Sequence, residues 1–133
     1  MDIATPDFDW QEEWEKAAGA EYQYFSLYTD LQLQLTLQDQ VFGSHYRIWD
    51  VIMDRGSKQL IWPLFVALKN LTGTAYFHDR HHCIDAIFHL AGIKNQALRK
   101  RLLGPSNEFD PLLFKMAMAE LEQKIKNKLA KIH

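Results

Sequence analysis

Apolar residues recur at steps of three and four between residues 78 and 103, the spacing that puts side chains on one face of an α-helix. They form two groups separated by Gly92, with Ile84, Ile87, Phe88 and Ala91 before it and Leu98 and Leu102 after it. Glycine suits such a joint because it adopts a positive φ without steric cost. The pattern predicts two short helices joined by a turn.

A similar pattern predicts a long final helix over residues 110–132. Asp110 followed by Pro111 is a favourable helix start, since Asp110 can cap free amides and Pro111 needs no hydrogen bond there. Its apolar stripe consists of Phe114, Met118, Leu121, Ile125, Leu129 and Ile132. Two acid–lysine pairs at helix-supporting spacing lie along it, Glu120 with Lys124 and Glu122 with Lys126. We expect this helix either to join two copies in a homodimer or to pack on its own domain.

The stretch 31–38 fits two kinds of structure. Leucine alternates there with glutamine or threonine, as in a half-buried strand. Leucine and glutamine favour helices, however, and β-branched residues are nearly absent, so we predict a helix. It would be apolar on two faces, one with Leu27, Tyr28, Leu31 and Leu35 and the other with Leu33, Leu37 and Val41. A helix of that kind is buried on both faces, for example between two subunits.

Further helical patterns precede the central pair, so the predicted fold class is all-α, with six or seven helices around a central helix-turn-helix. A chain of 133 residues that is 47% hydrophobic and 24% charged can bury one core, and we expect a single domain over residues 1–133. Within it, 78–103 is the helix-turn-helix and 110–132 the dimerisation helix.

The formal net charge is only −2, but the charged residues are distributed unevenly along the chain. Residues 1–57 hold 11 acids and 3 bases, whereas residues 58–133 hold 12 bases and 6 acids. Such a split suggests a basic working face, although both halves can also be ordinary solvated surface. Cys83 is the one cysteine of the sequence, so an internal disulfide is excluded and a reducing compartment is expected. We expect its side chain to be a buried apolar group of the core. The acidic start and the short apolar run of 60–68 predict a cytoplasmic protein without membrane contact.

The second short helix carries amide and guanidinium groups that suit double-stranded DNA. In this hypothesis Asn95 and Gln96 read adenine edges and Arg99 reads guanine in the major groove. The residues expected on phosphate are Lys94, Lys100, Arg101 and Arg80. The plain alternative is that this segment is a solvated amphipathic helix. The sequence therefore predicts a sequence-specific DNA-binding regulator that acts as a homodimer, not an enzyme, with no cofactor.

The order of elements, mainly over 60–103 and the final helix, resembles bacterial transcription regulators of the MarR type. That resemblance implies homodimers that bind DNA and carry a β-hairpin wing after the recognition helix. The segment from Gly104 to Pro111 leaves little room for a wing. The layout is thus more similar to the all-helical Trp repressor, in which a turn and a terminal helix follow the recognition helix directly.

Two other functions compete with DNA binding. His78, His82, Asp85 and His89 share one helical stripe, with His81 beside them, and such groups can chelate zinc or iron. One helix rarely supplies more than two ligands to an ion, however, so a polar flank beside the core is the favoured interpretation. The acidic, aromatic-rich N-terminal half would also suit an adaptor that binds another protein.

Overall fold

The computed structural model describes residues 9–39 and 47–131, and these residues form α-helices and short 3₁₀ turns without any strand. The predicted all-α class, with seven helices and a long last one, is confirmed. The helices are α1 (Trp10–Ser26), α2 (Asp30–Asp39), α3 (Arg47–Arg55), α4 (Ile61–Lys69), α5 (Phe77–Ala91), α6 (Gln96–Leu103) and α7 (Pro111–Ala130). In the described part of the chain, no helix is both long and apolar enough to cross a membrane.

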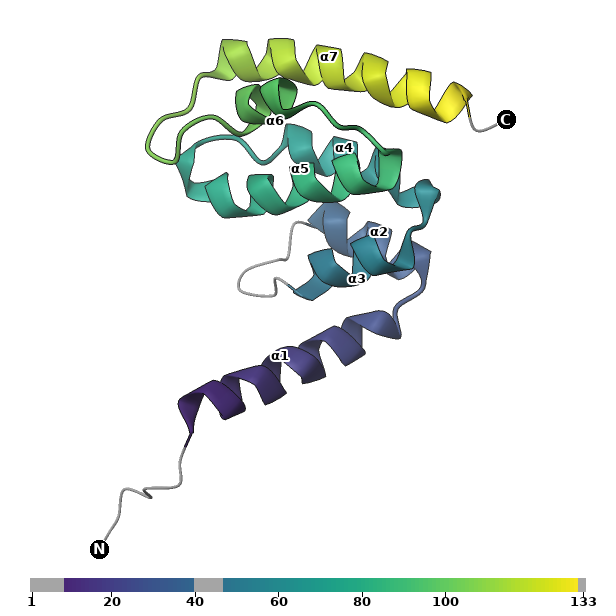
Figure 1. Cartoon of the computed structure of the whole chain (residues 1–133), viewed down its shortest axis with the longest axis vertical. Coiled ribbons are helices and arrows are strands. Elements are labelled where there is room, and N and C mark those ends of the chain that lie inside the picture. The colour runs from purple at the N-terminus through teal and green to yellow at the C-terminus, as the bar shows by residue number, and fades with distance from the viewer. Residues whose placement is uncertain (1–8, 40–46, 132–133) are drawn as a thin grey trace, which may run out of the picture.

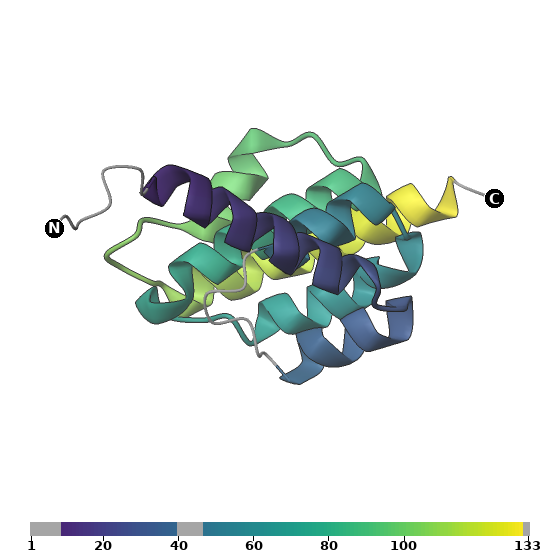
Figure 2. The same ribbon diagram turned by 90° about the horizontal axis from the view of Figure 1, so that it is seen from below.

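The helices stack in layers along the longest axis of the molecule (Figure 1). The helices α7 and α6 form one end, α5 and α4 lie beneath them, and α3 and α2 form the next layer. The helix α1 contacts mainly α3 and lies across the opposite end, as the view from below shows (Figure 2). The core runs through the middle layers, where Trp49, Ile61 and Ile84 are fully buried.

The ambiguous stretch around 31–38 is helical, which confirms the prediction. Leu33 and Leu37 are buried against the body of the protein, while Leu31 and Leu35 on the other face are exposed. The expected second buried face is therefore open in a single copy of the chain. Val41, assigned to the inner face, lies outside the described residues.

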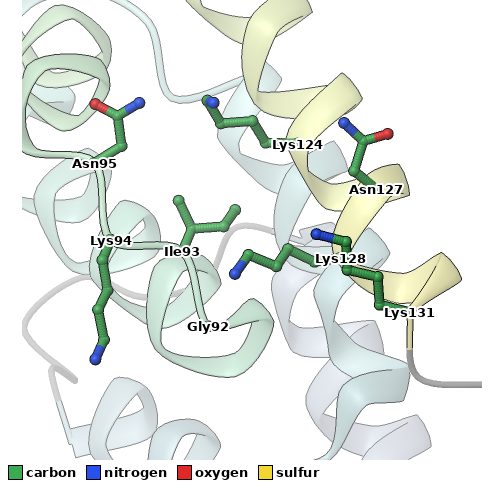
Figure 3. A pocket seen from close by; sticks show the side chains of 8 residues that line it. All are labelled: Gly92, Ile93, Lys94, Asn95, Lys124, Asn127, Lys128 and Lys131. Atoms are coloured by element: carbon green, nitrogen blue, oxygen red, sulfur yellow. The ribbon is translucent and has the colours of Figure 1, made fainter.

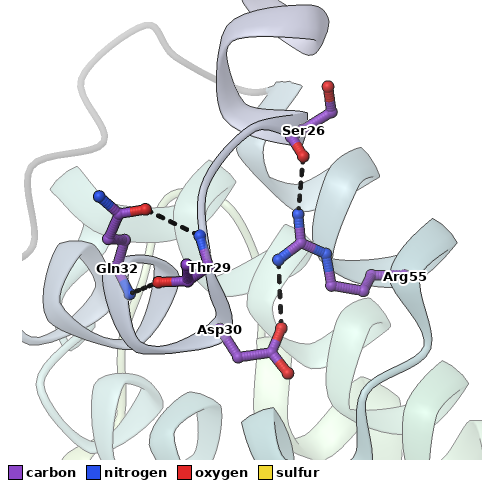
Figure 4. Close-up of polar contacts among 5 residues, drawn as sticks. All are labelled: Ser26, Thr29, Asp30, Gln32 and Arg55. Carbon is purple, nitrogen blue, oxygen red and sulfur yellow. Dashed lines mark hydrogen bonds and ion pairs between the residues drawn. The ribbon is translucent and has the colours of Figure 1, made fainter.

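A break at residues 27–29 divides the helical stretch into α1 and α2, and Thr29 is the reason for the new start. Its hydroxyl accepts a hydrogen bond from the Gln32 backbone N–H at 3.1 Å, and the Gln32 side chain accepts one from the Thr29 N–H at 2.8 Å (Figure 4). This reciprocal pair is a capping box. Arg55 of α3 then fixes the corner by donating to the Ser26 carbonyl and the Asp30 carboxylate.

The apolar stripe of α7 packs on its own domain. Phe114, Met118, Leu121 and Ile125 are buried against α6 and α5, whereas the predicted last member, Ile132, lies outside the described residues. Asp110 caps the helix as predicted, accepting from the N–H groups of residues 112 and 113, with Pro111 in the first turn.

The two predicted acid–lysine pairs on α7 have different outcomes. Glu122 and Lys126 form their ion pair at 3.1 Å. Glu120 instead accepts two hydrogen bonds from Arg101 of α6, at 2.9 and 3.1 Å. Lys124 interacts with Glu120 through its charge but forms no ion pair with it within 4.0 Å. A guanidinium that binds both carboxylate oxygens at once outcompetes a single ammonium group.

Candidate nucleic-acid interface

The two central helices are joined by a turn of the kind that the sequence predicts. Gly92 ends α5 in the left-handed conformation, with φ 70° and ψ 32°. The Ile93 N–H donates back to the Phe88 carbonyl at 3.0 Å, and the Ile93 side chain is buried. This is the Schellman arrangement, in which an apolar residue after the glycine seals the end of the helix. The turn holds the start of α6 firmly against α5.

The helix α6 is short and depends on tertiary contacts. Leu98 and Leu102 are buried against α5 and α7, as predicted. Asn95 precedes the helix and its side-chain oxygen accepts from the Leu98 N–H at 3.0 Å. The amide oxygen predicted to read adenine thus caps the helix, while Gln96, Ala97 and Lys100 form the outward face.

The two arginines of α6 are held by acids of the same chain. Arg99 lies 2.7 Å from the Asp85 carboxylate of α5, and Arg101 makes the two-bond contact with Glu120 of α7. The hydrogen bond from Arg101 lowers the pKa of Glu120, so this carboxylate stays ionised at neutral pH. Both guanidinium groups therefore position α6, and neither is free for guanine or phosphate in this arrangement.

Arg80 has no access to phosphate, so this part of the prediction is wrong. Its side chain is fully buried, and its guanidinium donates to the carbonyl oxygens of Leu71, Gly73 and Leu103 at 2.7–3.3 Å. The Leu71 and Gly73 carbonyls follow the end of α4 and the Leu103 carbonyl belongs to the last residue of α6, places where backbone oxygens lack helical partners. Spacing alone placed Arg80 beside the basic segment, but it lies on the inner face of α5.

A basic groove lies between the turn before α6 and the C-terminal half of α7. Its volume is about 540 Å³, and its lining residues are Gly92, Ile93, Lys94, Asn95, Lys124, Asn127, Lys128 and Lys131. Lys124 and Lys128 extend from α7 across the groove toward the turn, while the Lys94 ammonium group points away from α7 (Figure 3). The groove joins two of the predicted DNA contacts, Lys94 and Asn95, to side chains of a distant element.

The groove is positive because its lining contains four lysines and no acid. In the part of the chain that the structure describes, none of these lysines has a carboxylate within 4.0 Å. Glu120 interacts with Lys124 through its charge, but its hydrogen bonds are made with Arg101, whose positive charge offsets it. Unneutralised lysines that line one concave surface create a positive potential suited to an anionic ligand.

The lysines of α7 were not predicted as a site. The sequence shows them gathered near the C-terminal end of a helix, where the helix dipole alone accounts for positive charge. Their spacing contained one usable signal, since Lys124, Lys128 and Lys131 recur at steps of four and three and share a face. Only the fold places that face opposite Lys94.

The histidine stripe of α5 is divided among separate partners. His81 lies 3.3 Å from the Asp85 carboxylate, which also binds Arg99, and His82 stacks on Trp49 with ring centroids 6.4 Å apart. Within residues 9–39 and 47–131, no three histidine, cysteine or acidic side chains are arranged to hold a metal ion. Cys83 is buried and donates to the Leu64 carbonyl at 3.3 Å, as expected of a structural thiol.

The half-buried His82 should make stability depend on pH. Burial, and then the neighbouring His81, lowers the pKa of His82, although carboxylates of Asp50, Asp79 and Asp85 oppose the shift. The unfolded chain takes up this proton near pH 6.5, so His82 contributes its full stability above that pH. That contribution is lost as the pH falls from about 6.5 toward the lower folded pKa.

Thermal unfolding at pH 7.5 and pH 5.5 tests this expectation. His82→Phe keeps a ring against Trp49 and should reduce the acid-induced fall in Tm by about 2–4 °C. Replacing the exposed His89 by glutamine should leave the fall as in the wild type. An unchanged fall in His82→Phe would mean that other groups cause the acid sensitivity.

Comparison with known proteins adds no relationship. A scan against protein-family models, a search of curated proteins and a search of solved structures each found no match to this chain. The similarity of layout to MarR-type regulators and the Trp repressor stays a prediction from the order of elements.

Proposed function

We propose that the protein binds double-stranded DNA and regulates transcription. The outward face of α6 enters the major groove, and the lysines of the basic groove contact the phosphate backbone. The observation that carries this proposal is the groove itself, where lysines from two distant elements lie beside α6 without a carboxylate among them. The lone free thiol, Cys83, suits the cytoplasm, where such a regulator would work.

The start of α6 supports phosphate binding at the same place. The first N–H groups of a helix have no partner within the helix. In α6 the Leu98 N–H donates to the side chain of Asn95. The N–H groups of Gln96 and Ala97 point out of the helix start next to the groove, where a phosphate oxygen can accept from them. A phosphate there would also meet Lys94 and Lys124, which line the same groove.

The outward face of α6 gives the chemistry for reading bases. Gln96 and Lys100 are exposed one helical turn apart, with Ala97 beside them. A glutamine amide can bind the adenine edge with two hydrogen bonds, and a lysine can bind guanine O6 and N7. The small Ala97 lets the helix approach the floor of the DNA major groove and contact a thymine methyl group. This set replaces the arginine-based reading expected from the sequence.

Fluorescence anisotropy with a labelled random duplex tests the proposal. Lys94, Lys124, Lys128 and Lys131 can each contact one phosphate while Lys100 faces the bases, so the slope of log affinity against log salt should be about −3 to −4 per copy. The titration covers about 50 to 200 mM salt, the range in which such a slope is measurable. Absence of binding at the lowest salt, or binding that does not respond to salt, contradicts the proposal.

The double variant Lys124→Gln with Lys128→Gln should weaken binding about tenfold and reduce the salt slope by about 2, because two phosphate contacts are lost. The control replaces Lys69 and Lys126 by glutamine, which changes the net charge equally. Lys126 lies between the two replaced lysines on α7 but pairs with Glu122, and Lys69 lies over Phe65. Equal effects of the two variants would show that total charge matters and the groove does not.

An adaptor function is the second candidate, supported by the open face of α2. Leu31 and Leu35 are exposed one turn apart on α2, so an apolar strip of this helix remains uncovered in the single copy, and Leu27, before the break, is exposed as well. Exposed apolar stripes of this kind often contact another protein. Loss of binding to a purified partner in Leu31→Glu, with duplex binding absent in the wild type, would favour this alternative.

A further inference from the structure

The outer side of α7 carries a second stripe, opposite the one that packs on the domain. It consists of Leu112, Met116, Ala119, Gln123, Lys126 and Ala130, which are all exposed. The steps are four, three, four, three and four, the heptad spacing by which two helices pack together. Leu112 is 66% exposed, Met116 61%, and the adjacent Leu113 57%. The apolar part of this outer stripe is confined to the first half of the helix.

The position of α7 leaves this stripe open to a second molecule. The helix forms one end of the stack, with α6 and α5 on its inner side (Figure 1). The helix α4 borders only one flank of α7, where Phe65 and Lys69 line a shallow groove with Lys115, Ala119 and Glu122. The three large apolar side chains of Leu112, Leu113 and Met116 lie on two turns of the outermost helix and form one patch. Single exposed leucines are common on protein surfaces, whereas an apolar patch marks a site of interaction.

We propose that two copies of this chain pair through the first halves of their α7 helices, in antiparallel orientation. A crossing between Met116 and Ala119 sets the large Met116 of each copy against the small Ala119 of the other. Leu112 then lies next to Gln123 of the second copy. This arrangement alternates large and small side chains across a two-fold axis, so the same patch serves on both copies.

Charge complementarity favours a second copy of this chain as the partner on this patch. It also favours the antiparallel orientation of the two α7 helices. Lys115 comes directly before Met116, and Glu122 comes directly before Gln123. Both charged residues therefore lie on the same flank of the outer stripe. In antiparallel helices, side chains of this flank face one another across the interface, so Lys115 of each copy meets Glu122 of the other. The two-fold axis produces this contact twice, whereas a parallel pair would not form it.

The pairing also positions the proposed DNA-binding surface, and only this step rests on the proposed function. The lysines Lys124, Lys128 and Lys131 lie on average ten residues beyond the crossing, which is about 15 Å along a helix. The basic ends of the two copies are then about 30 Å apart, close to one turn of the DNA duplex. They lie about a third of a turn around α7 from the outer stripe, on the same flank in both copies, so both face the same side of the dimer.

Sedimentation equilibrium without DNA tests the pairing. The wild type should form dimers, and Met116→Glu should weaken association at least a hundredfold because it places two like charges in a shared apolar core. Leu31→Glu, a matched change at an exposed apolar residue of α2, should leave association unchanged. A monomeric wild type, or dissociation by Leu31→Glu and not by Met116→Glu, overturns the proposal.

A charge exchange tests the orientation. Lys115→Glu should weaken the dimer about tenfold, because it sets two acids against each other twice, and adding Glu122→Lys should restore it. If the double variant stays as weak as Lys115→Glu, the antiparallel register is wrong. A dimer that does not bind duplex overturns only the proposed function, and a monomer that binds duplex overturns only the pairing.

Discussion

Replacement of Arg80 by methionine should lower the free energy of unfolding by about 3–5 kcal/mol, the cost of leaving several buried polar groups without partners. Arg80 satisfies three carbonyl oxygens that have no helical donor, at 2.7–3.3 Å, and its guanidinium lies 4.8 Å from the centre of the Phe109 ring. Burial lowers the pKa of Arg80, but from a value far above neutral pH, so the group stays charged. Methionine fills much of the space and supplies no donor.

Urea unfolding followed by circular dichroism measures this change. Arg80→Lys should recover only part of the loss, because one ammonium group cannot reach three carbonyls in the geometry of a planar guanidinium. The matched control is Arg47→Met, which removes a half-buried arginine paired with Asp50 and should cost no more than about 1 kcal/mol. Similar losses in Arg80→Met and Arg47→Met would mean that the buried contacts contribute little.

The position of Arg80 also bears on function, because it links α5 to the end of α6. Among the residues that the structure describes, the guanidinium forms no ion pair, and it donates instead to the carbonyl of Leu103, the last residue of α6. An eight-residue helix is not stable alone, so its place on the surface depends on this contact and on Leu98 and Leu102. Loss of Arg80 should therefore disturb the surface of α6 before it unfolds the rest.

Local patterns predicted the helices well, because each amphipathic stripe repeats within a single element. The glycine turn at Gly92, the cap at Asp110 and the buried Leu98 and Leu102 all follow from short segments. The boundary at Thr29 was missed although its capping box is written in the sequence as Thr29-Asp30-Leu31-Gln32. The leucine stripes on both sides of it continue the same period, which hides the interruption.

The candidate site could be predicted only in part, because its charges are set by contacts between distant elements. Arg99 and Arg101 have the spacing of exposed groups, and their partners Asp85 and Glu120 lie 14 and 19 residues away. The groove likewise requires α7, with Lys128, to lie opposite the turn that contains Lys94. Helical spacing determines which residues share a face, but it does not determine what lies opposite that face.

The acids that hold these arginines give the second large expected effect. The double variant Asp85→Asn with Glu120→Gln should raise the affinity for duplex on the order of a hundredfold at low salt. It frees two guanidinium groups beside the proposed DNA surface and removes two negative charges near it. The slope of log affinity against log salt should become steeper by about 2 if each freed arginine reaches one phosphate. Stability should change little, since both pairs are partly exposed to solvent, which screens their attraction.

The matched control is Asp30→Asn with Asp50→Asn, which removes two acids that also belong to ion pairs, with Arg55 and Arg47. Its net charge equals that of the test variant, but both acids lie away from the exposed face of α6. If DNA contacts α6, only the test variant gains the steeper salt slope, because only its arginines are released beside the duplex. If the affinity for duplex rises equally in the two variants, the overall charge of the protein governs binding, and α6 does not lie in the major groove of the DNA. A test variant that binds as weakly as the wild type would remove α6 from the interface and leave only the lysines of α7 and Lys94.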